Sequence, residues 1–255
     1  MFRMIRVDKL AKSFKDKKRG IIHALDHISF DVRSGEIFGL LGPNGAGKTT
    51  CLRLLSTILK PTGGTAEVGG ADIVQSPEAV RRQIGFLSGD MGSHARLTPR
   101  EVLGFFGKLN GITGSRLSQR IDQMVEMFDF REYANTKIDK LSTGMKQKVA
   151  IARTVLHDPP ILILDEPSAG LDVPTARLIE RFILNAKRSG KCILFSTHVM
   201  EEAEYLCDRI GVVHQGRLKA LGTMEQLREL TGKQRLREIF LDLLDMPETR
   251  IEARI

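Results

Sequence analysis

The chain of 255 residues lacks the marks of several protein classes. No window approaches the roughly 20 uninterrupted apolar residues that a membrane-spanning helix needs. The first six residues lack the apolar core of a signal peptide. No internal repeat or low-complexity tract is visible. These absences exclude a membrane-embedded chain, and we expect a cytosolic one.

Cysteine is scarce. The three cysteines, Cys51, Cys192 and Cys207, are scattered and lack metal-ligand spacing. An odd number without such spacing argues against a disulfide framework and against a zinc site. We expect reduced, mostly packed thiols.

The charge balance is basic, with a net charge of +8 and a pI of 9.5. Such a charge is compatible with an acidic partner, a nucleic acid or an anionic membrane surface. The basic residues are spread out apart from a run over residues 15–19, which we interpret as a solvated loop. With 42% apolar and 27% charged residues, the chain can bury a substantial core.

A glycine-rich segment carries the strongest signal. An apolar run over residues 37–41 precedes it and a helical pattern follows it, which predicts strand, loop and helix. The loop meets the pattern G-x-x-x-x-G-K-[ST], whose glycines let backbone N–H groups turn towards phosphate oxygens. The dipole of the following helix favours the same anion. A surface turn is the alternative, which the flanking elements disfavour. The predicted nucleotide-binding residues here are Gly42, Pro43, Asn44, Gly45, Ala46, Gly47, Lys48, Thr49 and Thr50.

Lys48 is expected to reach the β- and γ-phosphates, and Thr49 to ligate Mg²⁺. Two carboxylates, Asp165 and Glu166, follow a second apolar run over residues 161–164. The carboxyl ends of central strands are where a doubly wound sheet places its ligand. Asp165 is therefore expected to hold Mg²⁺ through its hydration shell, and Glu166 to polarise a water for attack on the γ-phosphate. A solvated turn is the weaker alternative.

Other segments predict an α/β fold. A capping box at Thr98 to Glu101 starts a helix at Pro99, and helical spacing continues to about Leu156, as in a helical insertion. An apolar stripe in the tail, over residues 236–244, is expected to pack on its own domain; a partner-binding helix is the alternative. The expected strands are residues 5–7, 28–32, 65–68, 84–87, 161–164, 192–195, 210–213 and 217–221.

Further motifs, taken in order, resemble the ATP-binding cassette (ABC) family. Residues 141–145, Leu-Ser-Thr-Gly-Met, resemble its Leu-Ser-Gly-Gly-Gln signature, in which Ser142 and Gly144 would contact the γ-phosphate held by an opposite subunit. Residues 168–172 resemble its D-loop. His198, at the end of another apolar run, resembles its switch histidine.

Phe14 occupies the place of the family's adenine-stacking aromatic, and the resemblance extends from about Val7 to Leu221. It implies an α/β P-loop NTPase fold: a RecA-like parallel-sheet core with an N-terminal antiparallel β subdomain and a helical insertion. The expected domains are a nucleotide-binding domain at 1–230, with a helical subdomain at about 92–157, and a helical tail at 231–255.

The resemblance also implies the activity, which is ATP hydrolysis with ATP and Mg²⁺ as cofactors. Glu166 would act as base or water-orienting group, Lys48 would offset developing charge, and His198 would sense the γ-phosphate. The expected partners are a second copy, arranged head to tail, and a separate transmembrane permease. The expected location is the cytoplasmic face of the cell membrane.

Three departures from the family pattern stand out. Gly89 stands where a glutamine is usual, and either Ser88 or Asp90 would have to substitute; we hypothesise Asp90. The signature has Thr143 for glycine and Met145 for glutamine, and Phe14 replaces the more usual tyrosine. The segment around Gly89 and the tail sequence look most like the ATPase subunits of sodium-efflux (Nat-type) exporters.

Two other functions compete with this one. A soluble ABC-type ATPase acting on nucleic acid or the ribosome would typically carry two cassettes or a long coiled-coil insertion, and neither is present, so a nucleic-acid partner is not expected. A nucleotide-binding regulatory module without turnover is suggested by Gly89.

Overall fold

The structure is a computed structural model that describes residues 2–18, 20–88 and 95–245. It contains a four-stranded sheet in the order β2-β1-β4-β5 and a six-stranded sheet in the order β10-β9-β3-β8-β7-β6. The strands are β1 (Arg3–Asp16), β2 (Gly20–Arg33), β3 (Ile37–Leu41), β4 (Gly63–Val68), β5 (Ala71–Asp72), β6 (Ile84–Leu87), β7 (Ile161–Asp165), β8 (Cys192–Thr197), β9 (Arg209–His214) and β10 (Arg217–Gly222).

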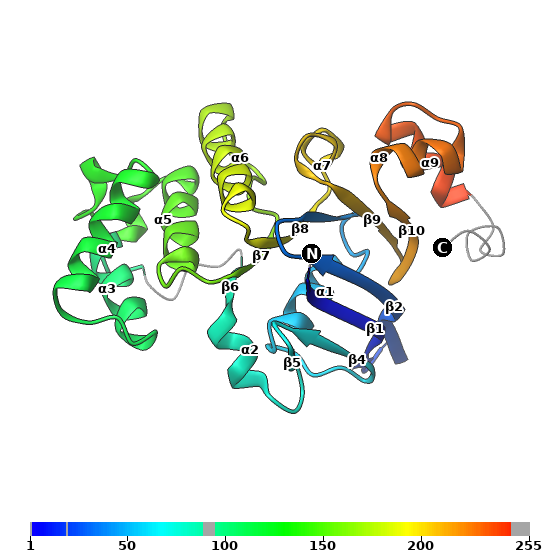
Figure 1. The fold of residues 1–255 in the computed structure, drawn as a ribbon, viewed down its shortest axis with the longest axis horizontal. Helices are drawn as coiled ribbons and strands as arrows, with labels where there is room; N and C mark the ends of the chain where they lie inside the picture. Colours follow the sequence, from blue (N-terminus) through cyan, green and yellow to red (C-terminus); the bar gives the residue numbers. More distant parts are fainter. Residues whose placement is uncertain (1, 19, 89–94, 246–255) are drawn as a thin grey trace.

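Helices surround the larger sheet and lie at both ends of the molecule's long axis (Figure 1). They are α1 (Lys48–Leu55), α2 (Pro77–Gln83), α3 (Pro99–Leu109), α4 (Gly114–Met127), α5 (Thr143–Val155), α6 (Val173–Arg188), α7 (Met200–Leu206), α8 (Met224–Thr231) and α9 (Leu236–Asp245). None of the helices in the described ranges is long and apolar enough to cross a membrane.

The six-stranded sheet brings three strand ends together. β8 lies between β3 and β7 and is parallel to both, and only β10, beside β9, is antiparallel. In this register Leu41 at the end of β3 pairs with Thr197, and Asp165 at the end of β7 pairs with Ser196. The phosphate loop, the two carboxylates and His198 therefore leave the sheet at one edge.

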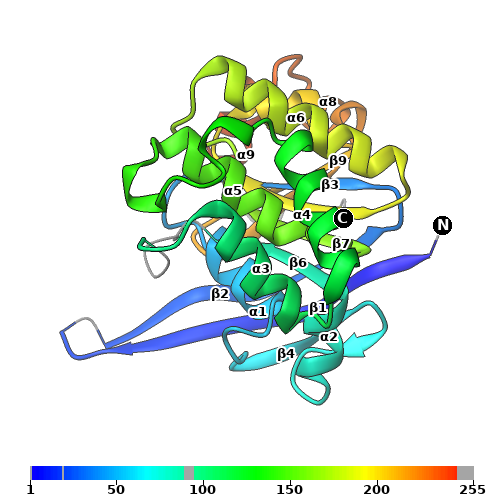
Figure 2. The same ribbon diagram turned by 90° about the vertical axis from the view of Figure 1, so that its left-hand side faces the viewer.

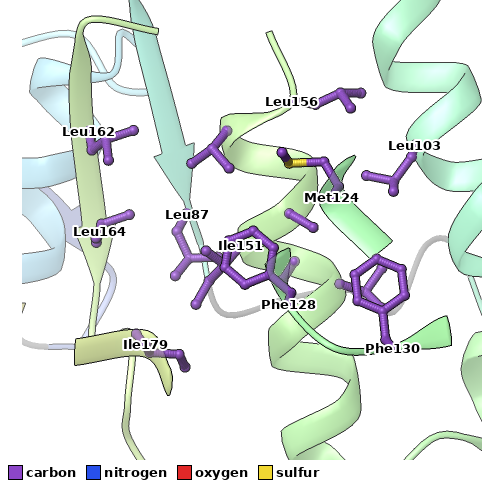
Figure 3. Close-up of a cluster of buried hydrophobic side chains, with 14 of the residues drawn as sticks. Leu87, Leu103, Met124, Phe128, Phe130, Ile151, Leu156, Leu162, Leu164 and Ile179 are labelled. Atoms are coloured by element: carbon purple, nitrogen blue, oxygen red, sulfur yellow. The ribbon is translucent and has the colours of Figure 1, made fainter. Parts of the chain in front are cut away.

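This sheet is buried on both faces, which explains its continuous apolar runs. Leu162 and Leu164 of β7 point into a cluster with Ile151 of α5, as Figure 3 shows. Ile161 and Ile163 face the opposite cluster, which contains the apolar residues of α1. Because side chains alternate along a strand, each face of β7 is apolar and each is covered.

The stretch predicted to be helical contains α3, α4 and α5, with two short 3₁₀ turns and no strand between residues 95 and 156. The capping box is present at the start of α3: the Thr98 side chain accepts from Glu101 N, and the Glu101 side chain accepts from Thr98 N. Leu103 is fully buried and Phe106 packs against the same cluster, whereas Phe105 is 51% exposed. The helical insertion is thus confirmed.

The basic run that we expected to be a loop lies at the end of a long hairpin: Lys15 and Asp16 are the last residues of β1, and Lys17 and Lys18 form a turn. β1 and β2 pair from Arg3 opposite Arg33 to Asp16 opposite Gly20, and Lys15 pairs with Ile21. The hairpin projects from the rest of the fold (Figure 2). The sequence predicted only the inner segments of this hairpin, residues 5–7 and 28–32, because the outer part, residues 12–16 and 20–24, has no buried face and so no apolar alternation to reveal it.

The C-terminal stripe packs on its own chain, as predicted. Leu236, Ile239, Phe240 and Leu243 are buried in a cluster with residues of β9, β10 and α7. The apolar face of α9 is therefore buried within the fold.

We predict that Gly85→Ala destabilises the fold. A Cβ atom at Gly85 of β6 would lie 2.5 Å from Thr154 O and 2.9 Å from Pro159 Cγ, so β6 and α5 would have to separate. Overpacking of this kind costs about 1–3 kcal/mol of unfolding free energy. The matched control is Gly104→Ala in α3, where the nearest atom to a Cβ is 4.0 Å away, and its stability should stay level or rise. Urea unfolding of both variants would measure the difference, and equal stabilities would contradict the prediction.

Candidate functional site

The phosphate loop joins β3 to α1, and its glycines are required by close packing. A Cβ at Gly42 would lie 2.3 Å from Val213 O. Gly47, the N-cap of α1, has φ 110°, and a Cβ there would lie 2.5 Å from Ala24 O. Only glycine fits both positions without moving the backbone. The phosphate loop is therefore packed closely against Val213 at its start and against Ala24 at its end, where α1 begins.

Lys48 is 4% exposed and lies within this loop. Its Nζ donates to Gly42 O at 2.7 Å and to Pro43 O at 3.1 Å, and lies 3.6 Å from Glu166 Oε1. Burial lowers the pKa of Lys48, while Glu166 and Asp165 act in the opposite direction. The ammonium is thus aimed from the loop towards the end of β7.

Asp165 is held by two hydroxyl groups. Thr49 Oγ1 donates to Asp165 Oδ1 at 3.0 Å, and Ser196 Oγ donates to the same oxygen at 2.6 Å. The two residues predicted to serve the metal, Thr49 and Asp165, are therefore in direct contact although they lie far apart in the sequence. Oxygen donors of this kind suit Mg²⁺, which usually takes one or two protein carboxylates and fills its shell with phosphate and water.

Glu166 lies between two basic side chains. Its Oε1 faces Lys48, and its Oε2 lies 3.1 Å from Nδ1 of His198, which is 42% exposed. The backbone of Glu166 has φ 47°, a left-handed conformation that costs a non-glycine residue on the order of 1 kcal/mol or more. Its N–H donates to Ser196 O at 3.2 Å and to Ser196 Oγ at 3.1 Å, which holds this turn.

The other predicted site residues lie elsewhere. Ser142 is the N-cap of α5, where its Oγ accepts from Met145 N, and Gly144 lies in the first turn of the same helix. Phe14 pairs with Ile22 near the end of the hairpin, with Lys12 Nζ 5.1 Å from its ring centroid. Among the contacts of the described residues, none joins these three to the group around Lys48.

Within the D-loop segment, Asp172 has a structural role, because its side chain accepts from Thr175 N and caps α6. Ser88 follows β6 directly. Gly89 and Asp90, on which the hypothesis of a substitute for glutamine rests, lie outside the described residues. That hypothesis remains a prediction.

Sequence reasoning missed three residues that fix this site. Ser196 holds both Asp165 and Glu166, and Gln147 Nε2 of α5 donates to Pro167 O at 2.7 Å. Glu202 of α7 accepts from Ser168 and Thr197. Their only sequence signal was position: Ser196 is the last but one residue of a buried strand, and Gln147 follows the signature.

Comparison with known proteins shows which family and which relatives the chain that carries this site resembles. The model of the ABC transporter family matches residues 25–169. The ABC transporter ATP-binding protein NatA of Bacillus subtilis is 40% identical over 242 residues, which cover 94% of this chain and 98% of that protein. The daunorubicin resistance ATP-binding protein DrrA3 of Streptomyces coeruleorubidus is 38% identical over 232 residues, which cover 91% of this chain and 72% of that protein.

Solved structures agree with this relationship. The structure of an ATP-binding subunit of an ABC transporter has a TM-score of 0.86 at 29% identity, with 95% of this chain and 100% of that chain covered. A dimeric ATP-binding cassette in a post-hydrolysis state, bound to ADP and Pi, has a TM-score of 0.80 at 26% identity, with 86% and 98% covered. The predicted ABC cassette fold is confirmed.

We predict that the three cysteines of the chain resist thiol reagents. Burial raises the pKa of Cys51, in α1, to about 12, and it also raises the pKa of Cys192 and Cys207. At pH 8 only roughly one Cys51 thiol in ten thousand would be ionised, and the thiolate is the reactive form. Native protein mixed with a disulfide reagent should therefore show almost no reaction, and urea-unfolded protein should react at all three thiols. Rapid native labelling of Cys51 would contradict this burial.

Proposed function

Since this chain belongs to the ABC transporter family and is an ATP-hydrolysing, ATP-binding subunit, we propose that it energises export through a separate membrane permease. The observation that carries the proposal is the meeting of Lys48, Asp165, Glu166 and His198 at one edge of the parallel sheet. One lysine, two carboxylates and one imidazole are the groups that phosphoryl transfer to water requires.

In the proposed mechanism, the backbone N–H groups of the phosphate loop and the N-terminus of α1 bind the phosphates. Lys48 moves its ammonium from the loop carbonyls towards the phosphate oxygens and offsets the charge that develops in the transition state. Glu166 accepts a proton from the attacking water or orients it. His198 contacts Glu166 and holds that carboxylate. It would also sense the γ-phosphate.

Thr49 and Asp165 would hold Mg²⁺, which when bound neutralises phosphate charge. No group of three or more His, Cys, Asp and Glu side chains among the described residues could hold a metal by itself. This agrees with a site that a nucleotide completes. Ser196 keeps Asp165 in place, since its hydroxyl occupies one lone pair of Oδ1.

Two copies are proposed to close head to tail, so that ATP lies between the phosphate loop of one and Ser142 and Gly144 of the other. The separation of these residues from the group around Lys48 supports a composite site, and so does the dimeric ADP- and Pi-bound relative. The helix dipole at the N-terminus of α5, behind Ser142, favours an anion there. ATP binding closes the pair, and hydrolysis opens it.

We predict that Glu166→Gln abolishes turnover and traps ATP-bound dimers. The amide keeps the size of the side chain and cannot accept a proton, so hydrolysis should fall by about a hundredfold or more. Steady-state phosphate release measures the first effect, and size-exclusion chromatography with ATP measures the second. Lys48→Ala is the contrasting variant, because it should weaken nucleotide affinity by roughly tenfold to a hundredfold. An unchanged hydrolysis rate in Glu166→Gln would refute the assigned role.

We further propose that the exported species is Na⁺ and that the chain sits at the cytoplasmic face of the membrane. The sequence likeness to Nat-type ATPase subunits supports this substrate, and the 40% identity to NatA agrees with it. The likeness to DrrA3, a protein named for daunorubicin resistance, makes a drug the competing cargo.

We predict that the membrane protein that co-purifies with this chain, reconstituted with it in proteoliposomes, moves radioactive Na⁺ when ATP is supplied. Glu166→Gln in the same vesicles is the matched control and should move none. ATP-driven movement of daunorubicin without Na⁺ would replace the proposed cargo. A co-purifying ribosome would overturn the transporter function itself.

A further inference from the structure

A buried carboxylate, Glu202, joins the two loops that follow β7 and β8. It lies in the first turn of α7, four residues after His198, and is 9% exposed. Ser168 Oγ donates to one of its oxygens, Oε1, and Thr197 Oγ1 donates to the other, Oε2, at 2.5 Å. Ser168 belongs to the turn after Glu166, and Thr197 immediately precedes His198. Glu202 therefore contacts both loops at once.

Both hydroxyl groups donate to Glu202, because an ionised carboxylate can only accept hydrogen bonds. Val199 N donates to Thr197 Oγ1 at 3.0 Å, so this hydroxyl is held on its acceptor side as well. The carboxylate receives both hydroxyl protons, one on each oxygen. A buried carboxylate held in this way resists displacement of either loop, because moving one leaves a buried acceptor without its donor.

An acidic residue in the first turn of a helix is favoured by the helix dipole. However, Glu201 already provides such a charge while exposed to solvent. Burial raises the pKa of Glu202, the two hydroxyl hydrogen bonds oppose that shift, and Glu180 and Glu166 add to it. Burying Glu202 therefore costs free energy, although the exposed Glu201 would be enough to interact with the dipole of α7.

We propose that Glu202 is a positioning residue for ATP hydrolysis, which holds the turn of Glu166 and Ser168 against the strand end of Thr197 and His198. This inference rests on the proposed roles of Glu166 and His198. The contact between Glu166 and His198 is one link between the two loops. Glu202 supplies another, through Ser168 and Thr197.

The test is a comparison of Glu202→Ala with Glu202→Gln and Glu201→Ala in the full chain. Displacement of catalytic groups by about 1 Å can cost a hundredfold in rate. We therefore expect Glu202→Ala to lower kcat roughly tenfold to a hundredfold while the Kd for ATP stays within about twofold. Glu202→Gln can still accept from one hydroxyl and donate to the other, so it should recover part of kcat. Glu201→Ala, on the same helix turn and exposed, should keep the parental kcat.

A double-mutant cycle separates positioning from general destabilisation. Ser168→Ala should lower kcat, and adding it to Glu202→Ala should cause little further loss, because both remove one link. A parental kcat in Glu202→Ala would overturn the inference, and so would a kcat loss that comes with an equal loss of ATP affinity and a large fall in melting temperature.

The Glu166→Gln variant, run in parallel, keeps the two proposals apart. If it lowers turnover and Glu202→Ala does not, only the role of Glu202 fails. If Glu166→Gln retains turnover, the assigned catalytic site itself is wrong.

Discussion

The parallel register of β3, β8 and β7 is the constraint on which the rest of the site depends. It places Leu41 opposite Thr197 and Asp165 opposite Ser196, so that three chain segments leave one sheet edge side by side. A slip of one residue in any strand would turn its side chains to the other face. Because β7 is apolar on both faces, its register depends on how Leu162 and Leu164 fit one cluster and Ile161 and Ile163 fit the other, and not on apolar character alone. The close packing of this core therefore brings the chemical groups within reach.

Charge divides the two carboxylates at the end of β7 into different roles. Asp165 is contacted by the neutral hydroxyls of Thr49 and Ser196, which leaves its negative charge available to a cation. Glu166 lies between Lys48 and His198, each of which contacts one of its two oxygens. Adjacent carboxylates facing phosphate would otherwise repel each other and the substrate. Separate partners suit one to a metal and the other to water.

Local patterns predicted the parts of the site that are contiguous in the chain. The phosphate loop, the carboxylates after the apolar run and the capping box at Thr98 each show themselves within a few residues. Ser196 and Glu202 could not be recognised in this way, because their roles depend on contacts with residues about 30 positions away that only the folded sheet creates. The outer part of the hairpin, beyond the predicted strands 5–7 and 28–32, was missed because it has no buried face and so no apolar signature.

The turn after β7 is fastened at three successive residues, each to a different element. Glu166 N donates to Ser196 of β8, Pro167 O accepts from Gln147 of α5, and Ser168 donates to Glu202 of α7. Glu166 also precedes a proline, which favours extended backbone and so opposes its left-handed conformation at φ 47°. A strained conformation persists only where its surroundings determine it, and here they do so from three sides. Because α5 begins at the signature, any displacement of that helix acts on the residue next to the proposed base.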